Sequence, residues 1–492
     1  MAPFVGPPFS GLGFETPASL ACVYLLVPRT NSCNPNLVFA NPAGGFGAIA
    51  LVDAFHYPTA LTDLQTFSAQ FGVKAPNLTV VFASGVKPAQ DPTGGWELEA
   101  ALDLQWAHAM APDARLLLVE ARSNSFSDLF AAERVAGQLV ANAGGGEVSN
   151  SWGGDEFASE TSFDSNFITD GVVYFASSGD QPGVQYPAAS PDVVAAGGTT
   201  TSRNASTANF LSERAWDLAS SGLSAFEARP AYQNVIQTIV GSRRGVPDLS
   251  FDSNPVTGAW VFDSTPVQGA GSGWFIVGGT SLASPALAGI VNAAGNKLGS
   301  SNAELNLIYN NLAITTDFND ISNGFCGPTA GFSGKVGWDL CTGIGSVSHY
   351  SNLFLVVHVG LVLAAFAGFT LAAALSGLYL WQDGRLRTRP ATILRRQMPA
   401  LATLDSLALR TVAWSVPLLT LGAAVGLVRL VARGDRLDAL IAVTAVTWLV
   451  WCAYLGLRLL GGWTGRRAAY LALAGFVLVI VVRLALPATH FA

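Results

Sequence analysis

Histidine is scarce in this sequence. Only five of the 492 residues are histidines: His56, His108, His349, His358 and His490. The last three lie in or beside very apolar stretches, and neither His56 nor His108 has the sequence context of a Ser-His-Asp triad. A serine nucleophile in this protein would therefore depend on a base other than histidine.

Positive charge is scarce in residues 1–350. This part has 13 Lys and Arg and 29 Asp and Glu, a formal net charge of −16. It has no basic cluster of the kind that binds nucleic acid, so we expect no nucleic-acid partner. The excess of carboxyl groups suits a protein that operates at low pH.

Lysine is absent from residues 351–492, which have 13 arginines and four aspartates, a net charge of +9. Apolar stretches near 353–381, 411–431, 438–460 and 468–487 are each long enough to cross a bilayer. We therefore predict two domains: residues 1–350, and an all-α transmembrane domain of about four helices at 351–492.

The arginines also predict the orientation of these spans. Eight follow the first and third apolar stretches, at 385, 387, 389, 395, 396, 458, 466 and 467, and three follow the second, at 429, 433 and 436. Loops rich in arginine stay in the cytoplasm. Residues 1–350 are therefore expected on the extracytoplasmic or extracellular side of the membrane.

Cysteine is also rare, with five residues in the chain. Cys22 and Cys33 bracket one loop and Cys326 and Cys341 bracket another, which predicts two disulfides and an oxidising compartment. Cys452 lies in a hydrophobic stretch, where we expect an inert apolar residue.

Residues 1–10, MAPFVGPPFS, lack the basic start and apolar core of a signal peptide. Because 350 residues precede the first apolar stretch, we expect a truncated start, or two unrelated reading frames joined in one sequence. A true fusion of two proteins is the alternative.

Apolar runs at 47–53, 115–120 and 172–176 alternate with helical stretches near 60–71, 96–110, 127–142 and 281–296. This alternation predicts an α/β fold with a doubly wound parallel sheet and flanking helices.

The helical stretch at 96–110 has two carboxyl groups on one face, because Glu99 and Asp103 are four residues apart. Among Trp96, Leu102 and Trp106 such a pair would share a proton, which keeps one carboxyl available as acid or base. Taken alone, the pair is better explained as a solvated acidic helix face. Glu97 is the rival of Glu99, but two residues turn a helix by roughly 200°.

The run Gly-Gly-Thr-Ser-Leu-Ala-Ser-Pro at 278–285 is a turn that leads into a helix, with Ser281 at its start. Subtilisin-like folds present a nucleophilic serine in such a turn. The alternative is a helix N-cap, which is a frequent role of serine.

Further motifs follow in a fixed order: Ala-Pro-Asp-Ala and an apolar strand after the Glu99 helix, VSNSWGG at 148–154, and FASSGD at 175–180, before the Gly-Thr-Ser281 turn. Together they resemble the sedolisins, the serine-carboxyl peptidases, over about residues 13–348. The resemblance implies a subtilisin-like fold and a serine-type endopeptidase that acts on peptides and proteins at acidic pH.

The resemblance also implies roles for individual residues. Ser281 would be the nucleophile, Glu99 its general base, and Asp103 the partner that shares the Glu99 proton. Asp180 would line the oxyanion hole, which requires a protonated carboxyl group; alone it is an ordinary turn aspartate.

Trp152 and Gly153 would form the backbone edge that pairs with an extended substrate. The alternative for Trp152 is a tryptophan buried at the end of a strand.

A calcium site is implied near the end of the same domain, since sedolisins bind one calcium ion there. The implied ligands are the side chains of Asp320 and Asp339 and the carbonyls of Ile321, Lys335 and Gly337. Lys335 stands where the family usually has glycine, which leaves the middle ligands open.

The segments at 404–422, 447–451 and 465–476 resemble cytochrome c assembly proteins, which handle haem. His358 and His490 lie near the membrane histidines of that family and are candidate haem ligands. However, the short segment 432–438 replaces the expected tryptophan-rich loop, so histidines without a ligand role are favoured. The rival function is thus a haem-handling membrane protein with a non-catalytic outer domain, and a folded but latent protease is a third possibility.

Overall fold

The computed structural model describes residues 6–295, 299–312, 317–327, 331–348, 352–388, 399–433 and 439–485. The chain separates into two compact units, Met1–Ser351 and Asn352–Ala492. Each unit is described by itself.

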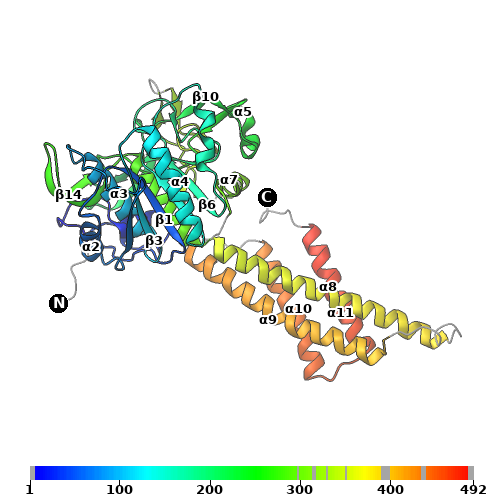
Figure 1. The fold of residues 1–492 in the computed structure, drawn as a ribbon. Helices are drawn as coiled ribbons and strands as arrows, with labels where there is room; N and C mark the ends of the chain where they lie inside the picture. The colour runs from blue at the N-terminus through cyan, green and yellow to red at the C-terminus, as the bar shows by residue number, and fades with distance from the viewer. Residues whose placement is uncertain are drawn as a thin grey trace. The chain divides into compact units, whose positions relative to one another are not determined.

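A ten-stranded sheet forms the centre of the first unit (Figure 1). Its order is β15-β18-β12-β8-β6-β4-β1-β3-β2, and β9 pairs with β8. Along this order, neighbouring strands from β2 at one edge to β18 pair in parallel. Strands β9 and β15 are antiparallel to their neighbours. The strands are β1 Ala48–Ala54, β2 Asn77–Phe82, β3 Arg115–Ala121, β4 Gly146–Asn150, β6 Val172–Ser177, β8 Val194–Arg203, β9 Phe210–Ala215, β12 Leu249–Asp252, β15 Phe318–Asn319 and β18 Ser346–Val347. The predicted parallel α/β sheet is confirmed.

Four short two-stranded sheets lie outside the central one. They pair β5 Gly154–Asp155 with β7 Gln185–Tyr186, β10 Gly222–Ala228 with β11 Arg243–Val246, β13 Ala259–Val267 with β14 Gly271–Val277, and β16 Phe325–Cys326 with β17 Phe332–Ser333.

Helices cover both faces of the sheet, because side chains alternate along buried parallel strands. In β1, Ile49 and Leu51 belong to the core beneath α2, α3 and α6, while Ala50 and Val52 belong to the core beneath α4. The helices of this unit are α1 Pro17–Val23, α2 Ala60–Phe71, α3 Gly95–Met110, α4 Phe126–Asn142, α5 Gln237–Val240, α6 Thr280–Ala294 and α7 Ser301–Asn310.

Helices α3 and α6 pack closely against each other. A Cβ atom at Gly289 of α6 would lie 2.8 Å from the Ala107 carbonyl oxygen and 2.8 Å from Met110 Cβ, so only glycine allows this approach. The Trp106 indole of α3 donates a 3.2 Å hydrogen bond to the Trp260 carbonyl of β13. These contacts fix α3, which carries Glu99 and Asp103, relative to α6, which carries Ser281.

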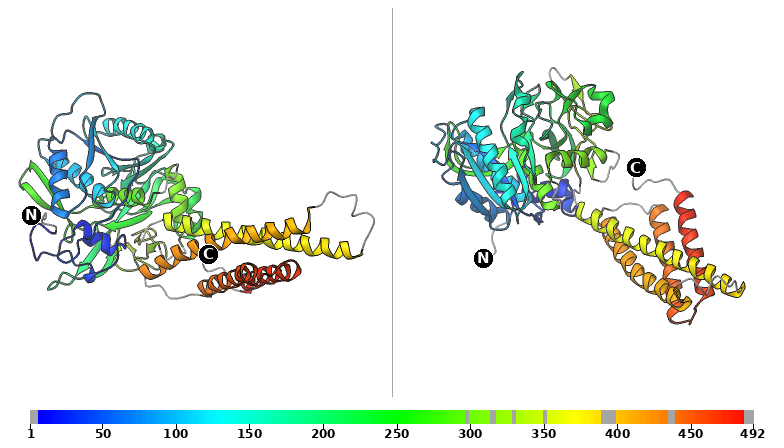
Figure 2. Two further views of the ribbon diagram at one scale, coloured as in Figure 1. Left: turned by 90° about the horizontal axis from the view of Figure 1, so that it is seen from below. Right: turned by 45° about the vertical axis from the view of Figure 1, so that its right-hand side comes forward.

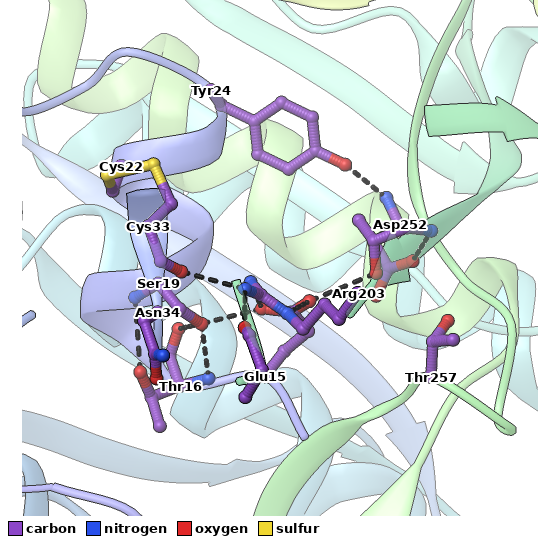
Figure 3. Close-up of polar contacts among 12 residues, drawn as sticks. Glu15, Thr16, Ser19, Cys22, Tyr24, Cys33, Asn34, Arg203, Asp252 and Thr257 are labelled. Atoms are coloured by element: carbon purple, nitrogen blue, oxygen red, sulfur yellow. Dashed lines mark hydrogen bonds and ion pairs between the residues drawn. A yellow bond between two sulfur atoms is a disulfide. The ribbon is translucent and has the colours of Figure 1, made fainter. Parts of the chain in front are cut away.

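The N-terminal segment is fastened to the sheet by buried polar contacts (Figure 3). The Arg203 guanidinium pairs with the Glu15 carboxylate at 2.6 Å and donates a 2.8 Å hydrogen bond to the Cys33 carbonyl. Disulfides join Cys22 to Cys33 and Cys326 to Cys341, as predicted.

The second unit consists of α8 Asn352–Thr388, α9 Leu401–Arg433, α10 Ala439–Leu459 and α11 Arg466–Ala485. Helices α8 and α9 run side by side (Figures 1 and 2). Within the described residues two segments are long and apolar enough to cross a membrane, Leu361–Arg387 and Leu401–Ala424, and Thr444–Leu459 is a shorter apolar helix. The all-helical prediction is confirmed, and the structure supports two of the four predicted spans.

Buried charges also pair inside the second unit. Arg458 of α10 contacts both carboxylate oxygens of Asp405 at 3.0 and 3.1 Å and donates to the Trp463 carbonyl. Cys452 is free, as expected.

Candidate active site

The start of α3 is fixed by an aspartate. One carboxylate oxygen of Asp91 accepts hydrogen bonds from the backbone N–H groups of Gly95 and Trp96 at 3.0 and 3.2 Å, which satisfies donors at the helix start. Gly94 precedes the helix with φ of 74°, and a Cβ atom there would lie 2.3 Å from the Pro266 carbonyl oxygen. This anchored start sets the rotation of α3.

Glu99 and Asp103 face the interior, so the pair is not a solvated helix face. Asp103 is fully buried, and Glu99 is half-buried. The Ser151 hydroxyl donates a 2.7 Å hydrogen bond to Asp103 Oδ1. Glu97 instead accepts a hydrogen bond from the Asp91 N–H at 3.1 Å, which leaves Glu99 as the residue that faces Ser281.

Ser281 lies in the first turn of α6, where its hydroxyl is close enough to Glu99 to oppose the rise in the pKa of that carboxyl group. The N-cap of α6 is Gly279, with φ of 104°, so Ser281 does not serve as the N-cap. Its side chain is half-buried and so retains access to solvent. A hydroxyl next to a carboxyl base is the pairing that an activated nucleophile requires.

Burial raises the proton affinity of both carboxyl groups. The pKa of Glu99 is raised to about 7 by burial, against the hydrogen bond from Ser281, with a further increase from the charge of Asp180. The pKa of Asp103 is raised well above its usual range by burial and then by the charges of Asp53 and Glu99. In acid the pair therefore retains at least one proton.

Asp180 lies against the turn before Ser281. Its Oδ1 accepts hydrogen bonds from the Thr280 N–H at 2.7 Å and the Thr280 hydroxyl at 2.9 Å. Its Oδ2 is so close to Gly279 that a Cβ atom there would lie 2.6 Å away. Asp180 is exposed overall, but desolvation of its carboxyl group beside the turn raises its pKa, against the hydrogen bonds from Thr280. One oxygen is thus held by Thr280 and the other lies beside the turn that carries Ser281.

Asp53 is a third buried carboxyl group in this site, which the sequence did not reveal. It is 1% exposed at the end of β1, and neither oxygen has a hydrogen-bond partner among the described residues. Burial raises its pKa, followed by the charges of Glu99 and Glu120. The one available signal was an acidic residue ending an apolar strand on the same face as Ile49 and Leu51.

Trp152 and Gly153 differ in their surroundings. The Trp152 indole is 5% exposed and packs against Phe126 and Phe130 at ring distances of 6.2 and 6.0 Å, so the side chain belongs to the core. Gly153 is exposed, and the next residues, Gly154 and Asp155, pair with Tyr186 and Gln185. A role in substrate binding therefore concerns the backbone here.

The residues implied in calcium binding meet at one loop. The Gly337 N–H donates to an Asp320 carboxylate oxygen and the Lys335 N–H donates to an Asp339 carboxylate oxygen, both at 2.8 Å. A Cβ atom at Gly334 would lie 2.7 Å from the Ile321 carbonyl oxygen, which places this carbonyl beside the loop. Oxygen donors of this kind suit a hard cation. In the described part of the chain, no group of three or more His, Cys, Asp and Glu forms a metal site, and this set depends on backbone carbonyls instead.

A serine beside the carboxyl groups of Glu99 and Asp103, at the edge of a parallel sheet, is an arrangement suited to nucleophilic catalysis. The chain is 32% identical to kumamolisin from Bacillus sp. (strain MN-32) over 322 residues, which cover 58% of this chain and 55% of that protein. It is 31% identical to sedolisin from Pseudomonas sp. (strain 101) over 243 residues, which cover 46% of this chain and 37% of that protein. The first unit is thus similar to sedolisins, and the chain spans about half the length of kumamolisin and less of sedolisin.

A solved structure agrees on the fold. Pseudomonas sedolisin, a serine-carboxyl proteinase complexed with two molecules of pseudo-iodotyrostatin, matches with a TM-score of 0.56 at 24% identity and covers 68% of this chain and 95% of its own. The predicted subtilisin-like fold is confirmed.

Residues 343–487 match the family model of the cytochrome c assembly protein. The chain is also 30% identical over 144 residues to the cytochrome c biogenesis protein CcsA from Guillardia theta, which covers 26% of this chain and 48% of that protein. The second predicted resemblance is confirmed. The side chain of His358 and the whole of His490 lie outside the described residues.

Proposed function

We propose that this protein is a serine-type endopeptidase that hydrolyses peptide bonds at acidic pH. The observation that carries the proposal is the position of the Ser281 hydroxyl next to Glu99, a carboxyl group whose pKa is raised to about 7, on the same helix as the buried Asp103. A base whose pKa lies near the working pH can both accept and return a proton.

Acylation would use three of these side chains. Ser281 Oγ attacks the carbonyl carbon of the substrate while its proton passes to Glu99, and Asp103 shares that proton. The carbonyl oxygen becomes an oxyanion, to which protonated Asp180 donates a hydrogen bond. Glu99 then gives the proton to the leaving amine nitrogen as the C–N bond breaks.

Deacylation repeats these roles with water. A water molecule attacks the acyl carbon and gives a proton to Glu99, which returns it to Ser281 Oγ as the ester bond breaks. The step requires Asp180 to be protonated again. Because the pKa of Asp180 is raised, this donor persists to higher pH than an ordinary aspartic acid and is favoured by acid.

Peptides and proteins are the proposed substrates. The exposed Gly153 leads into the short β5 edge, where an extended chain would add main-chain hydrogen bonds. The carboxylate oxygens of Asp320 and Asp339 and the carbonyl oxygens of Ile321, Lys335 and Gly337 would hold one calcium ion, which would stabilise the C-terminal loop of the domain.

The second unit would anchor the protein in a membrane, with α8 to α11 as four spans and the peptidase domain outside the cytoplasm. Two apolar helices and the family match over residues 343–487 support the anchor. The two disulfides support an oxidising location.

Peptide hydrolysis by the detergent-solubilised full chain, assayed with calcium from pH 3 to pH 7, tests the proposal. We expect cleavage in acid, its loss near neutrality, and its loss at every pH in Ser281→Ala. Activity that survives in Ser281→Ala, or a folded wild-type protein that cleaves nothing, would reject it.

A second candidate function is haem handling by the membrane unit, favoured by the family match over residues 343–487. Haem absorbance of the purified full chain that disappears in His358→Ala would support it. Absence of haem absorbance after purification with added haem would argue against it.

A further inference from the structure

Two residues beside the catalytic carboxyl groups, His56 and Glu120, have no role in the mechanism described above. His56 Nδ1 lies 2.8 Å from Glu120 Oε2 and 3.1 Å from Oε1. The His56 side chain is 11% exposed, whereas that of Glu120 is 1% exposed. The pair thus connects a buried carboxylate with the edge of solvent.

The sheet places Glu120 next to Asp53. Strands β1 and β3 are parallel neighbours, and Asp53 is the register partner of Glu120. Register partners on parallel strands point to the same face, and Ile49, Leu51, Leu116 and Leu118 show that this face is the one covered by α3. Glu120 therefore lies beside Asp53, on the side where α3 carries Glu99 and Asp103.

The backbone holds His56 in place. Phe55 adopts φ of 67°, in the left-handed region, which turns the chain sharply after β1. The His56 N–H donates to the Ala89 carbonyl at 2.9 Å, the Phe82 ring meets the imidazole edge-on, and the Tyr57 N–H donates to Glu120 Oε1 at 3.0 Å. This geometry orients both partners before any substrate binds.

Few other charges lie near the pair. The groups that surround it are Asp53 of β1, Glu99 and Asp103 of α3, the exposed Lys87 after β2, and Asp63 and Asp263 beside Tyr57. Most are carboxyl groups. Asp53 has no hydrogen-bond partner among the described residues. Its proton affinity therefore depends on the charges of the neighbouring groups.

We propose that His56 favours the ionised form of Glu120, and that the negative charge of Glu120 sets the pH range in which Glu99 and Asp103 hold their shared proton. Burial raises the pKa of Glu120, and the contacts with His56 and with the Tyr57 N–H oppose this rise. An ionised Glu120 next to Asp53 favours the retention of protons by Asp53, Asp103 and Glu99. His56 and Glu120 are therefore positioning residues that act through Asp53.

The pH profile of kcat/KM tests this inference, which rests on the proposed peptidase function. Glu120→Gln is close in shape and removes the negative charge. The two limbs of the profile, where kcat/KM rises with pH and where it falls, should therefore both move to lower pH, by about half to one unit. His56→Gln should move them in the same direction and no further, because Glu120 then becomes protonated. The double variant should match Glu120→Gln, and Lys74→Gln, which breaks an exposed ion pair with Asp113, should leave both limbs in place.

Several results would overturn the inference. A shift of the limbs to higher pH in His56→Gln would mean that Glu120 stays charged without the imidazole. Lower activity with unmoved limbs would show a structural role only. Additive shifts in the double variant would show that the two residues act separately.

A second measurement does not need activity. Coupling between sites is reciprocal, so if the pair affects proton binding at Glu99, then Glu99 affects proton binding at His56. In the full chain with isotope-labelled histidine and the Ser281→Ala substitution, adding Glu99→Gln should lower the pH midpoint of the His56 ring signals by about 0.3 unit or more. An unchanged midpoint would reject the coupling even if peptides are cut, and a changed midpoint in a protein that cuts nothing would reject only the proposed peptidase.

Discussion

The Ser151 hydroxyl donates a 2.7 Å hydrogen bond to Asp103 Oδ1, and Ser151 Oγ also lies 3.2 Å from the Ser281 carbonyl oxygen. Ser151 at the end of β4 thus contacts both α3 and α6. It links the carboxyl pair to the backbone of the nucleophile.

Ser151→Ala should alter the pH profile as well as the rate. The hydrogen bond from Ser151 lowers the pKa of Asp103 against burial, so its loss should move the acidic limb to higher pH. The free energy of unfolding should fall by about 1–3 kcal/mol, because a buried acceptor loses its donor. The measurements are kcat/KM against pH and thermal unfolding.

Ser149→Ala is the matched control for this substitution. Ser149 lies two residues earlier, on β4, and its buried hydroxyl hydrogen-bonds Ser284 at 2.8 Å instead of a carboxyl group. It should lose stability without moving the acidic limb. Equal limb shifts in the two variants would contradict the assigned role of Ser151.

Gly279→Ala should disable the site. The new methyl group would lie 2.6 Å from Asp180 Oδ2, at a residue with φ of 104°. Asp180 would have to move, and the loss of one oxyanion donor lowers kcat by about 10²–10³-fold. Steady-state kinetics at acidic pH measure this loss.

Gly269→Ala separates the two effects of that substitution. Gly269 has φ of 82°, and a Cβ atom there meets nothing within 4 Å. This variant should lose only about 1 kcal/mol of stability and keep its kcat. A comparable loss of kcat in both variants would show that backbone strain, and not contact with Asp180, is responsible.

Helix spacing and motif order sufficed to predict that Glu99 and Asp103 share one face of a helix and that Ser281 lies at a helix start, because these features depend on local structure. Asp53, Glu120 and His56 were not predictable as partners. Their proximity follows from the register of β1 with β3, which joins residues 67 positions apart in the chain. Strand periodicity shows which face a side chain occupies and gives no information about which strand lies beside it. Likewise, VSNSWGG placed Trp152 at a strand end, but only packing against Phe126 and Phe130 shows that its indole is in the core.

The first unit should become less stable as pH rises from about 4 to 8. Burial raises the pKa of Glu133 to about 8, opposed by the hydrogen bond from Asn150, and raises the pKa of Asp53, Asp103 and Glu147 well above the usual range. In this pH window the folded protein binds protons that the unfolded chain releases. Stability is therefore greatest below about pH 4 and is lost as pH increases.

Glu133→Gln tests the contribution of one such group. It should reduce the dependence of unfolding free energy on pH by up to about 1.4 kcal/mol per pH unit within this window. Thermal unfolding of the full chain from pH 4 to pH 8 gives the slope. Asp155→Asn, at an exposed carboxyl, serves as control, and an unchanged slope in Glu133→Gln would refute the assignment.

Calcium should stabilise the first unit through the loop around Lys335 and Gly337. A ligand that binds only the folded state adds about 2.7 kcal/mol at a concentration 100-fold above its dissociation constant. Chelation should therefore lower the unfolding temperature, and Asp320→Asn should reduce this difference, because a neutral amide is a weaker ligand for a hard cation. The exposed Asp217→Asn should leave the effect of chelation unchanged. Equal unfolding temperatures with and without chelator in the wild type would show that Asp320 and Asp339 act only through the backbone N–H groups of this loop.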